Sequence, residues 1–313
     1  MQLITHSGSF HADEVTACAI LTGIARFQNA DIIRTRDPKI IDAAEAGDIV
    51  FDIGMVYDPD QLRFDHHMGA SDPTKPYRDD EDNTPYSSVG LIWKFFGHEY
   101  LAERHPNLSQ EAIDEIWGKL DRSIIKRIDM IDNGVGSGFA PDDLTAMIDD
   151  FSPDWDDDST SEDEAFMNAV AFARSAIERR VDRAASRQRA YSRVVEYINA
   201  SPDPRYMVLE TSMPWEDTVF KGGYTDLLYV VSEREGGWYC TAVPLEKGSF
   251  DKRKAFPQEW SGLRGKDLAA ITGVEDVIFC HPALFICGAK SKEGLMALLQ
   301  QALDYEPNPA PSI

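Results

Sequence analysis

Three consecutive polar residues, Asp65, His66 and His67, constrain the fold more than any other feature of the sequence. They follow residues 61–64, which we expect to form a short strand. Side chains of a strand alternate between its two faces, so adjacent histidines point the same way only where the strand has ended. At a strand terminus they can line a cleft, and imidazole is a good ligand for divalent metals. A pair of surface histidines in a loop is the alternative reading, and the other polar clusters bear on that choice.

A second polar cluster lies near the start of the chain, where a strand is expected to give way to a helix. Residues 1–5 read as the strand and residues 15–22 as the helix, and His6, His11 and Asp13 lie between them. Ligands of parallel α/β sheets bind at this kind of transition. A glycine within the turn allows the chain to bend tightly and to bring groups on both sides together. The three side chains are therefore candidate metal ligands.

A further acidic candidate, Asp52, lies near the carboxyl end of a strand expected over residues 48–52. Gly54 follows it closely, as is typical of a turn. A carboxylate that only caps this turn is the alternative interpretation. Together with the two histidine clusters, however, Asp52 indicates that several strand ends carry metal-binding groups.

A long helix is predicted over residues 109–132, because apolar residues recur there at helical spacing. Asn133-Gly134 is a good stop signal for this helix. Asp129 and Asp132 are three residues apart, so both can lie on one helix face. Acids in the last turn oppose the helix dipole, and a nearby cation would offset that cost. We predict that one of the two is a ligand, with Asp132 favoured over Asp129.

These clusters form an ordered series of motifs, THSGSFHADE, VFDIG, RFDHH and IDNG. The series resembles the MYG1 family within the DHH phosphoesterase superfamily. Fragments of the second half, such as residues 213–215, 249–253, 257–264 and 279–286, resemble the same family in order and spacing. General DHH enzymes have an aspartate where this chain has His11, which leaves open which metal is preferred.

The resemblance implies an α/β fold, with a parallel-sheet DHH-type metal domain followed by a smaller mixed α/β substrate-binding domain. We expect two divalent ions, Mn²⁺ being favoured by the mixed nitrogen and oxygen ligands. The expected metal ligands are His6, His11, Asp13, Asp52, His66 and one acid of the pair Asp129 and Asp132. Asp52 is expected to bridge the ions, Asp65 to orient an imidazole, and His67 to act on the phosphoryl or leaving group.

The second half of the chain carries candidate substrate-binding residues. Strands are predicted over residues 206–210, 226–232, 238–243, 277–280 and 284–287, and a helix over residues 293–303. His281 resembles the substrate-holding histidine of DHH enzymes, and Arg264 lies in a family-like segment. Gly288, Lys290 and Lys292 lie between a strand and a helix, where backbone N–H groups and lysines can hold a phosphate. The expected clamp combines this turn with His281.

Length and composition agree with a two-domain protein of 313 residues. We expect a catalytic domain over residues 1–150, an acidic linker and connecting helix over 151–200, and a substrate-binding domain over 201–313. No stretch is long and apolar enough to span a membrane, and no secretory signal or arginine-rich leader is recognisable. The cysteines form no metal or disulfide pattern, so we expect a cytoplasmic protein.

The net charge of −23 is unevenly distributed. Residues 142–164 hold eleven acids and no Lys or Arg, and the helix that follows, to about residue 199, is rich in arginine between residues 174 and 193. Such a basic stretch suits a phosphate backbone, whereas pairing with the acidic domains is the alternative. The overall acidity argues against avid non-specific binding of long nucleic acid but is compatible with a short or positioned strand.

The residues themselves indicate metal-dependent phosphoester hydrolysis, in which two ions lower the pKa of a water. The family resemblance implies a 3′-to-5′ exonuclease acting on RNA or oligonucleotides. A phosphoesterase for dinucleotides, nucleoside phosphates or pyrophosphate is one alternative. A non-catalytic RNA or nucleotide binder is the other. The sequence leaves the natural substrate and assembly into a homo-oligomer open.

Overall fold

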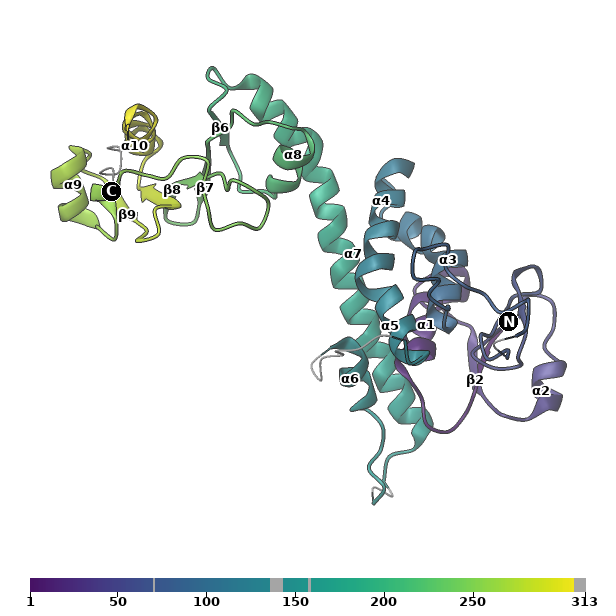
Figure 1. Cartoon of the computed structure of the whole chain (residues 1–313). Helices are drawn as coiled ribbons and strands as arrows, with labels where there is room; N and C mark the ends of the chain where they lie inside the picture. The colour runs from purple at the N-terminus through teal and green to yellow at the C-terminus, as the bar shows by residue number, and fades with distance from the viewer. Residues whose placement is uncertain (70, 136–142, 157–158, 307–313) are drawn as a thin grey trace, which may run out of the picture. The chain divides into compact units, whose positions relative to one another are not determined.

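The structure is a computed structural model that describes residues 1–69, 71–135, 143–156 and 159–306 (Figure 1). It divides into two compact units, Met1–Ala185 and Ser186–Ile313. The boundary falls inside the long helix α7 (Glu162–Ala200), not at the boundaries 150/151 and 200/201 that the sequence predicts. The first part of α7 contributes Phe166 to the core of the first unit, and its last part contributes Val194 to the second. The connecting helix is therefore part of both units and not a separate linker.

The first unit contains a five-stranded sheet that is parallel except at one edge. Its strands are β1 (Gln2–Thr5), β2 (Asp31–Arg34), β3 (Ile49–Phe51), β4 (Tyr57–Asp58) and β5 (Arg63–Phe64), in the order β2-β1-β3-β5-β4. The pairs formed by β2, β1, β3 and β5 are parallel, and β4 runs antiparallel to β5. The carboxyl ends of β1, β3 and β5 therefore meet at the same edge. The predicted parallel sheet is confirmed.

The first unit also contains helices, most of which share an apolar core with the sheet. They are α1 (Ala12–Leu21), α2 (Pro38–Asp42), α3 (Ser88–Arg104), α4 (Gln110–Leu120), α5 (Lys126–Asp132) and α6 (Leu144–Asp149), with the short turns η1 (Ala25–Phe27) and η2 (Pro59–Gln61). All residues of α1 are buried. Its apolar residues join Phe51, Phe64, Trp93 and Phe96 in one core cluster. Because α1 is buried, the candidate site residues in its first turn are held in a fixed position.

The single helix predicted over residues 109–132 is interrupted. A π-helical turn, η3 (Asp121–Ile125), lies between α4 and α5. Such insertions rotate the side chains that follow relative to those that precede. The apolar spacing does not reveal this, because Ile113 before the turn, Ile124 within it and Ile128 after it are all buried. Asn133 and Gly134 end α5 as predicted, with Gly134 at φ 63°.

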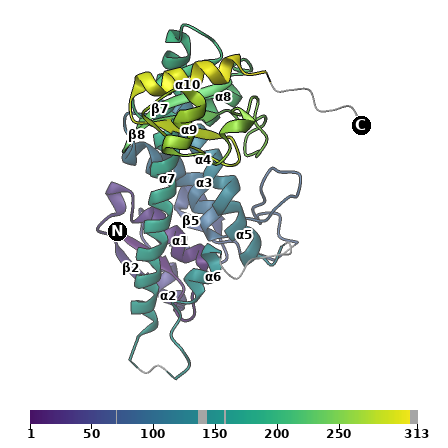
Figure 2. The same ribbon diagram turned by 90° about the vertical axis from the view of Figure 1, so that its left-hand side faces the viewer.

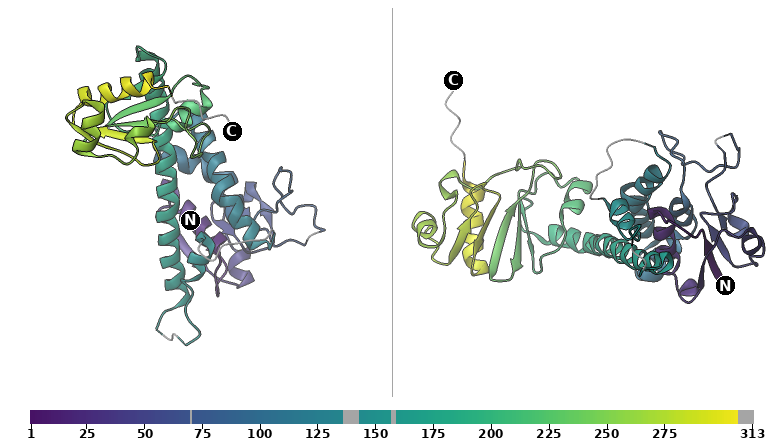
Figure 3. Two further views of the ribbon diagram at one scale, coloured as in Figure 1. Left: turned by 60° about the vertical axis from the view of Figure 1, so that its left-hand side comes forward. Right: turned by 90° about the horizontal axis from the view of Figure 1, so that it is seen from below.

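The second unit is a mixed sheet with helices, as predicted. Its strands are β6 (Tyr206–Leu209), β7 (Tyr229–Arg234), β8 (Gly237–Ala242), β9 (Val277–Cys280) and β10 (Ile286–Ala289), in the order β6-β7-β8-β10-β9. The pair β6 and β7 is parallel and the others are antiparallel. The remaining elements are α8 (Glu216–Lys221), η4 (Gln258–Trp260), α9 (Gly265–Thr272) and α10 (Lys292–Asp304). Helix α10, drawn in yellow, lies along this sheet (Figure 2), as a further view confirms (Figure 3).

The four cysteines are buried free thiols. In the part of the chain that the structure describes, no helix has both the length and the apolarity needed to cross a bilayer. Residues 157–158 of the acidic stretch and the predicted tail at 307–311 lie outside the described residues.

Gly90 of α3 provides a test of the packing between α3 and α5. A Cβ at this position would lie 2.5 Å from Asp129 Oδ1 and 2.6 Å from Tyr86 Cδ1. We expect Gly90→Ala to lower the free energy of unfolding by about 1–3 kcal/mol through overpacking. Gly69→Ala is the control, because nothing lies within 4 Å of a Cβ there. Denaturant midpoints measure both, and equal midpoints for the two variants would contradict the close approach.

Candidate metal centre

The ends of three parallel strands bring the first group of candidate residues together. His6 follows β1, Asp52 follows β3, and His66 lies two residues beyond β5. Asp52 Oδ2 lies 3.2 Å from His6 Nε2, and Asp52 Oδ1 lies 3.1 Å from His66 Nε2. The backbone of Asp52 is left-handed, at φ 57°, a conformation that aspartate adopts more readily than most residues. One carboxylate therefore joins two buried imidazoles.

Helix α1 contributes two buried carboxylates. Asp13 Oδ2 accepts hydrogen bonds from the backbone N–H and the hydroxyl of Ser88, at 3.1 and 2.8 Å. Asp13 Oδ1 is buried and has no hydrogen-bond partner among the described residues. Glu14 accepts hydrogen bonds from the backbone N–H of His11 at 2.9 and 3.0 Å and lies 3.0 Å from His6 Nε2. A buried carboxylate oxygen without a partner is costly, so Asp13 Oδ1 is suited to bind a cation.

Asp132, at the end of α5, completes the cluster. His66 Nε2 lies 3.4 Å from Asp132 Oδ2 and 3.8 Å from Asp13 Oδ2. His11 is exposed at the start of α1, and it has a ring nitrogen within 4.8 Å of carboxylate oxygens of Asp13 and Asp132. The overlapping groups that could hold a metal ion also include Asp52, Glu14, His6 and, with Asp65, His67.

Asp129, the other acid of the predicted pair, belongs to a separate buried network. Its Oδ2 accepts hydrogen bonds from Arg78 Nε and Nη2 at 3.0 and 2.6 Å, and its Oδ1 accepts three from Ser87 and Gly90. Burial raises the pKa of Asp129 to about 6, against the attraction of Arg78. Arg78 also binds Asp121 of the π turn at 2.6 Å. Asp129 therefore holds α3, α5 and a loop together, and Asp132 is the acid that lies with the histidines.

The pKa values show how much negative charge the cluster confines. Burial and the charges of Asp13 and Asp52 raise the pKa of Asp132 to about 9, and burial raises that of Glu14 to about 8. Burial alone would lower the pKa of His6, but hydrogen bonds and charge interactions with Asp52 and Glu14 outweigh this effect and raise the pKa to about 10. Burial also opposes ionisation of Asp52, yet its hydrogen bonds with His6 and His66 lower its pKa to about 2. The raised pKa values of Asp132, Glu14 and His6 mean that, in the absence of a metal ion, these side chains retain protons that offset the negative charge of the cluster.

Asp65 and His67 form a pair at the edge of the cluster. Asp65 Oδ1 accepts hydrogen bonds from His67 Nδ1 and from the backbone N–H of His66, each at 2.7 Å. The hydrogen bond to Asp65 raises the pKa of His67. Despite the burial of Asp65, its hydrogen bonds with His67 and Met55 lower its pKa. The side chain of His67 is 55% exposed, so this imidazole can reach a molecule in the cleft.

The cleft beside the cluster has a volume of about 430 Å³ and includes residues that the sequence patterns miss. Lys75 lines it from a loop, where no periodicity marks it. Asp149 lines it from the end of α6. Glu14 could have been found, because it lies three residues after the helix-capping His11, as in a capping box. Ser88, which holds Asp13, is the first residue of α3 and gives no comparable signal.

His281 lies in a cavity of about 440 Å³ in the second unit, together with Trp215, Phe250 and Lys252. Its ring centroid is 4.5 Å from that of Phe285. Its Nδ1 accepts a hydrogen bond from the backbone N–H of Ala283 at 3.0 Å. Arg264 lies elsewhere, with its guanidinium 5.6 Å from the ring of Phe279.

The predicted clamp of His281 with Gly288, Lys290 and Lys292 is wrong. Because β9 and β10 are antiparallel, His281 lies at one end of β10 and the lysines follow its other end. The N–H groups that were expected to hold a phosphate already bind Asp276, from Lys290 at 2.9 Å and from Ser291 at 2.8 Å. Gly288 is buried within β10, and Lys292 lies over the ring of Trp238 at 5.0 Å. An acidic residue at the turn disfavours an anion.

Asp129 and Asp132 should respond differently to the same substitution. We expect Asp132→Asn to lose divalent-ion binding and to keep its thermal stability, because the carboxylate lies in the metal cluster. We expect Asp129→Asn to lower the free energy of unfolding by about 3–5 kcal/mol, because Arg78 loses a buried partner, and still to bind metal when folded. Mn²⁺ titration calorimetry and thermal unfolding separate the two. Loss of metal binding in Asp129→Asn alone would contradict these roles.

Comparisons with known proteins agree with the motif series. The model of the uncharacterised protein family UPF0160, MYG1_exonuc, matches residues 2–303. The MYG1 exonuclease of Bos taurus is 29% identical over 98% of this chain and 86% of its own length. A MYG1 protein of Schizosaccharomyces pombe is 30% identical over 98% of this chain and 99% of its own length. RecJ of Thermus thermophilus with Mn²⁺ matches 98% of this chain and 53% of its own at 15% identity, with a TM-score of 0.29, too low to support any inference. The predicted family is confirmed, and this chain belongs to the MYG1 family.

Proposed function

We propose that this protein is a metal-dependent phosphodiesterase that removes nucleotides from the 3′ end of RNA or short oligonucleotides. The supporting observation is the cluster of buried imidazoles and carboxylates with the unpartnered Asp13 Oδ1. Full-length relatives are named exonucleases, which favours a nuclease over other phosphoesterases.

The donor set fits two divalent ions. The proposed ligands are His6, His11, Asp13, Asp52, His66 and Asp132, with Glu14 as a further donor. Mixed imidazole and carboxylate ligands suit Mn²⁺. One carboxylate oxygen of Asp52 faces His6 and the other faces His66, so Asp52 is the candidate ligand to bridge two ions. Bound ions would lower the pKa of a water and neutralise charge that develops at phosphorus.

The remaining residues of the cleft have roles that follow from their positions. Asp65 orients His67 and keeps its Nδ1 bonded, so Nε2 is the atom that can donate a proton to the leaving oxygen or a phosphoryl oxygen. The ammonium of Lys75 provides positive charge for the phosphoryl group. The volume of about 430 Å³ suits a single nucleotide.

In the second unit, we propose that the cavity around His281 contributes to substrate selection. It offers the rings of Trp215 and Phe285, which can stack on a base, and the side chains of Lys252 and His281, which can approach a phosphate.

A small-substrate phosphoesterase is the second candidate, because the cleft holds no more than about one nucleotide. Comparing turnover of a dinucleotide with that of longer oligoribonucleotides separates the two. A preference for the dinucleotide would favour the second candidate. A non-catalytic binder would show neither activity and would still bind the oligonucleotide.

A time course with a 5′-labelled oligoribonucleotide and Mn²⁺ tests the reaction itself. A 3′-to-5′ exonuclease shortens the labelled strand step by step, whereas attack from the other end releases the label first. We expect His66→Ala to lose metal and activity. We expect His67→Ala to retain metal and to lose about 10²–10⁴-fold in rate, the contribution of one positioned proton donor. Equal metal loss in both variants would show that the roles of the histidines are exchanged or shared.

The pH profile tests the link between Asp65 and His67. Because Asp65 raises the pKa of His67, the protonated imidazole persists to higher pH, and the rate should fall as the pH rises through that raised value. Asp65→Asn removes the negative charge and should move this alkaline limb to lower pH, with a smaller effect on KM than on kcat. Metal content and thermal unfolding control for indirect damage. An alkaline limb that does not move would rule out His67 as the donor.

A further inference from the structure

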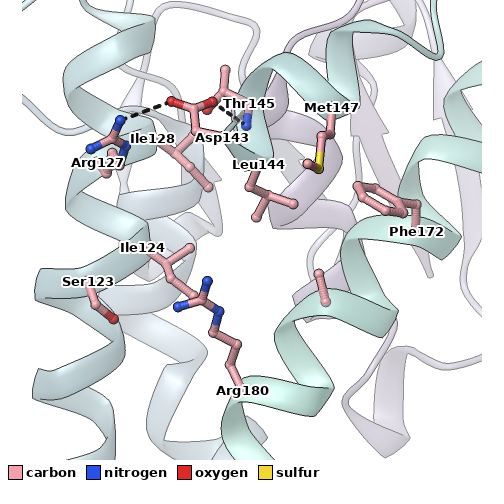
Figure 4. A pocket seen from close by; sticks show the side chains of 11 residues that line it. Ser123, Ile124, Arg127, Ile128, Asp143, Leu144, Thr145, Met147, Phe172 and Arg180 are labelled. Atoms are coloured by element: carbon pink, nitrogen blue, oxygen red, sulfur yellow. Dashed lines mark hydrogen bonds and ion pairs between the residues drawn. The ribbon is translucent and has the colours of Figure 1, made fainter. Parts of the chain in front are cut away.

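A second cavity, of about 340 Å³, opens beside the metal cleft within the first unit. It lies between the helical segment η3–α5, helix α6 and helix α7 (Figure 4). Ile128 and Thr145 line both this cavity and the metal cleft, so the two spaces share a wall. No role in metal binding or proton transfer falls to it. We call it the α6–α7 cavity.

The lining of the α6–α7 cavity is apolar with two arginines. Ile124, Leu144, Met147 and Phe172 provide the apolar surface. Figure 4 shows Arg180 extending from α7 into the cavity, with Arg127 on the opposite helix. An apolar surface with aromatic and thioether groups accepts a flat ring, and guanidinium groups accept phosphate. The combination fits a nucleotide.

The two arginines differ in how they are held. Arg127 Nη2 lies 3.2 Å from Asp143 Oδ2, and Asp143 Oδ1 accepts a hydrogen bond from the backbone N–H of Thr145 at the start of α6. Arg180 has no hydrogen bond or ion pair with any residue that the structure describes. The acids of α7 nearest to it, Glu178 and Asp182, pair with Arg104 of α3. Arg180 is therefore the arginine that is available to a ligand.

The wall that the two spaces share lies about one helical turn from Asp132 of the metal cluster. Ile128, in the shared wall, precedes Asp132 by four residues of α5. This separation corresponds to a rise of about 6 Å along the helix. A strand whose terminal nucleotide occupies the metal cleft can therefore place its neighbour against Ile128 and enter the α6–α7 cavity.

We propose that the α6–α7 cavity binds the nucleotide next to the scissile phosphodiester, with its base against Phe172 and Met147 and its phosphate at Arg180. This inference rests on the proposed function and adds the determinant of substrate length. Substrates that extend past the cleaved bond gain this site, and small phosphodiesters do not. It also assigns a role to one residue of the arginine-rich helix.

The test compares Arg180→Ala with Arg179→Ala. Arg179 is the adjacent arginine of the same helix and does not line the cavity, so it controls for loss of one positive charge. Fluorescence anisotropy of a labelled oligoribonucleotide, in metal-free buffer at several salt concentrations, measures binding independently of turnover. We expect Arg180→Ala to weaken binding about tenfold and to reduce the salt slope by about one, as for a lost phosphate contact. Arg179→Ala should bind like the unmodified chain.

Turnover separates this inference from the proposed function. With Mn²⁺, Arg180→Ala should raise KM for the oligoribonucleotide and leave hydrolysis of bis(p-nitrophenyl) phosphate unchanged. If the unmodified chain hydrolyses neither compound, the proposed function is wrong. The anisotropy data still test whether the α6–α7 cavity binds a nucleotide, because they do not depend on turnover.

Three outcomes would overturn the cavity assignment. The first is identical oligonucleotide binding by Arg180→Ala and the unmodified chain. The second is equal weakening by Arg180→Ala and Arg179→Ala, which indicates diffuse surface charge. The third is displacement of the labelled strand by an acidic peptide as efficiently as by unlabelled RNA, which indicates a peptide site. Met147→Ala, at an exposed side chain, gives a second variant in which weakened binding without a changed salt slope is expected.

Discussion

The carboxylate of Asp52 connects the main parts of the site. It contacts the two imidazoles that follow β1 and β5, and it lies close to the acids of helix α1. Its two oxygens face His6 and His66, which follow the neighbouring strands β1 and β5. Its backbone N–H donates a hydrogen bond to the carbonyl of Phe64 of β5 at 3.2 Å. The same residue thus aligns the sheet edge and the two histidines. Its left-handed backbone stores local strain, and such strain persists where the surroundings hold it in place, as at functional sites.

This arrangement is costly without a cation. Asp13, Glu14, Asp52 and Asp132 lie close together with little solvent, and the raised pKa values of Glu14 and Asp132 express their mutual repulsion and burial. A bound divalent ion would replace the protons on these groups, so metal binding and folding free energy are coupled. The arginine network of Asp129 serves a different purpose. It ties α5 to α3 and to the loop that carries Arg78 through a permanent internal cation.

Local pattern was sufficient to predict the strand ends, and therefore His6, Asp52 and His66, because strand ends in a parallel sheet share an edge. It could favour Asp132 over Asp129 only weakly, since both lie on one helix face and the decisive partner, Arg78, is far away in sequence in a loop. Lys75 was missed because it lies in a loop, where no periodic pattern marks it, and reaches the cleft only in the folded chain. The phosphate clamp was wrong because the sequence does not show that Asp276 turns its carboxylate toward the lysine-bearing loop. The site predictions that failed depend on polar partners far apart in the sequence, such as Arg78 with Asp129, more than on secondary structure.

An acidic chain that binds a polyanion needs its positive charge in a confined place. The net charge of −23 repels nucleic acid at long range, but at physiological ionic strength the screening length is about 8 Å, so remote acids contribute little inside a cavity. Lys75 lines the metal cleft and Arg180 lines the α6–α7 cavity, which is where the phosphates of a bound strand would lie under the proposed function. Long duplexes or structured RNA would meet a protein of net negative charge. Under the proposed function, a single-stranded end would enter the cavities, and the confined positive charge would then favour ends over internal sites, as an exonuclease requires.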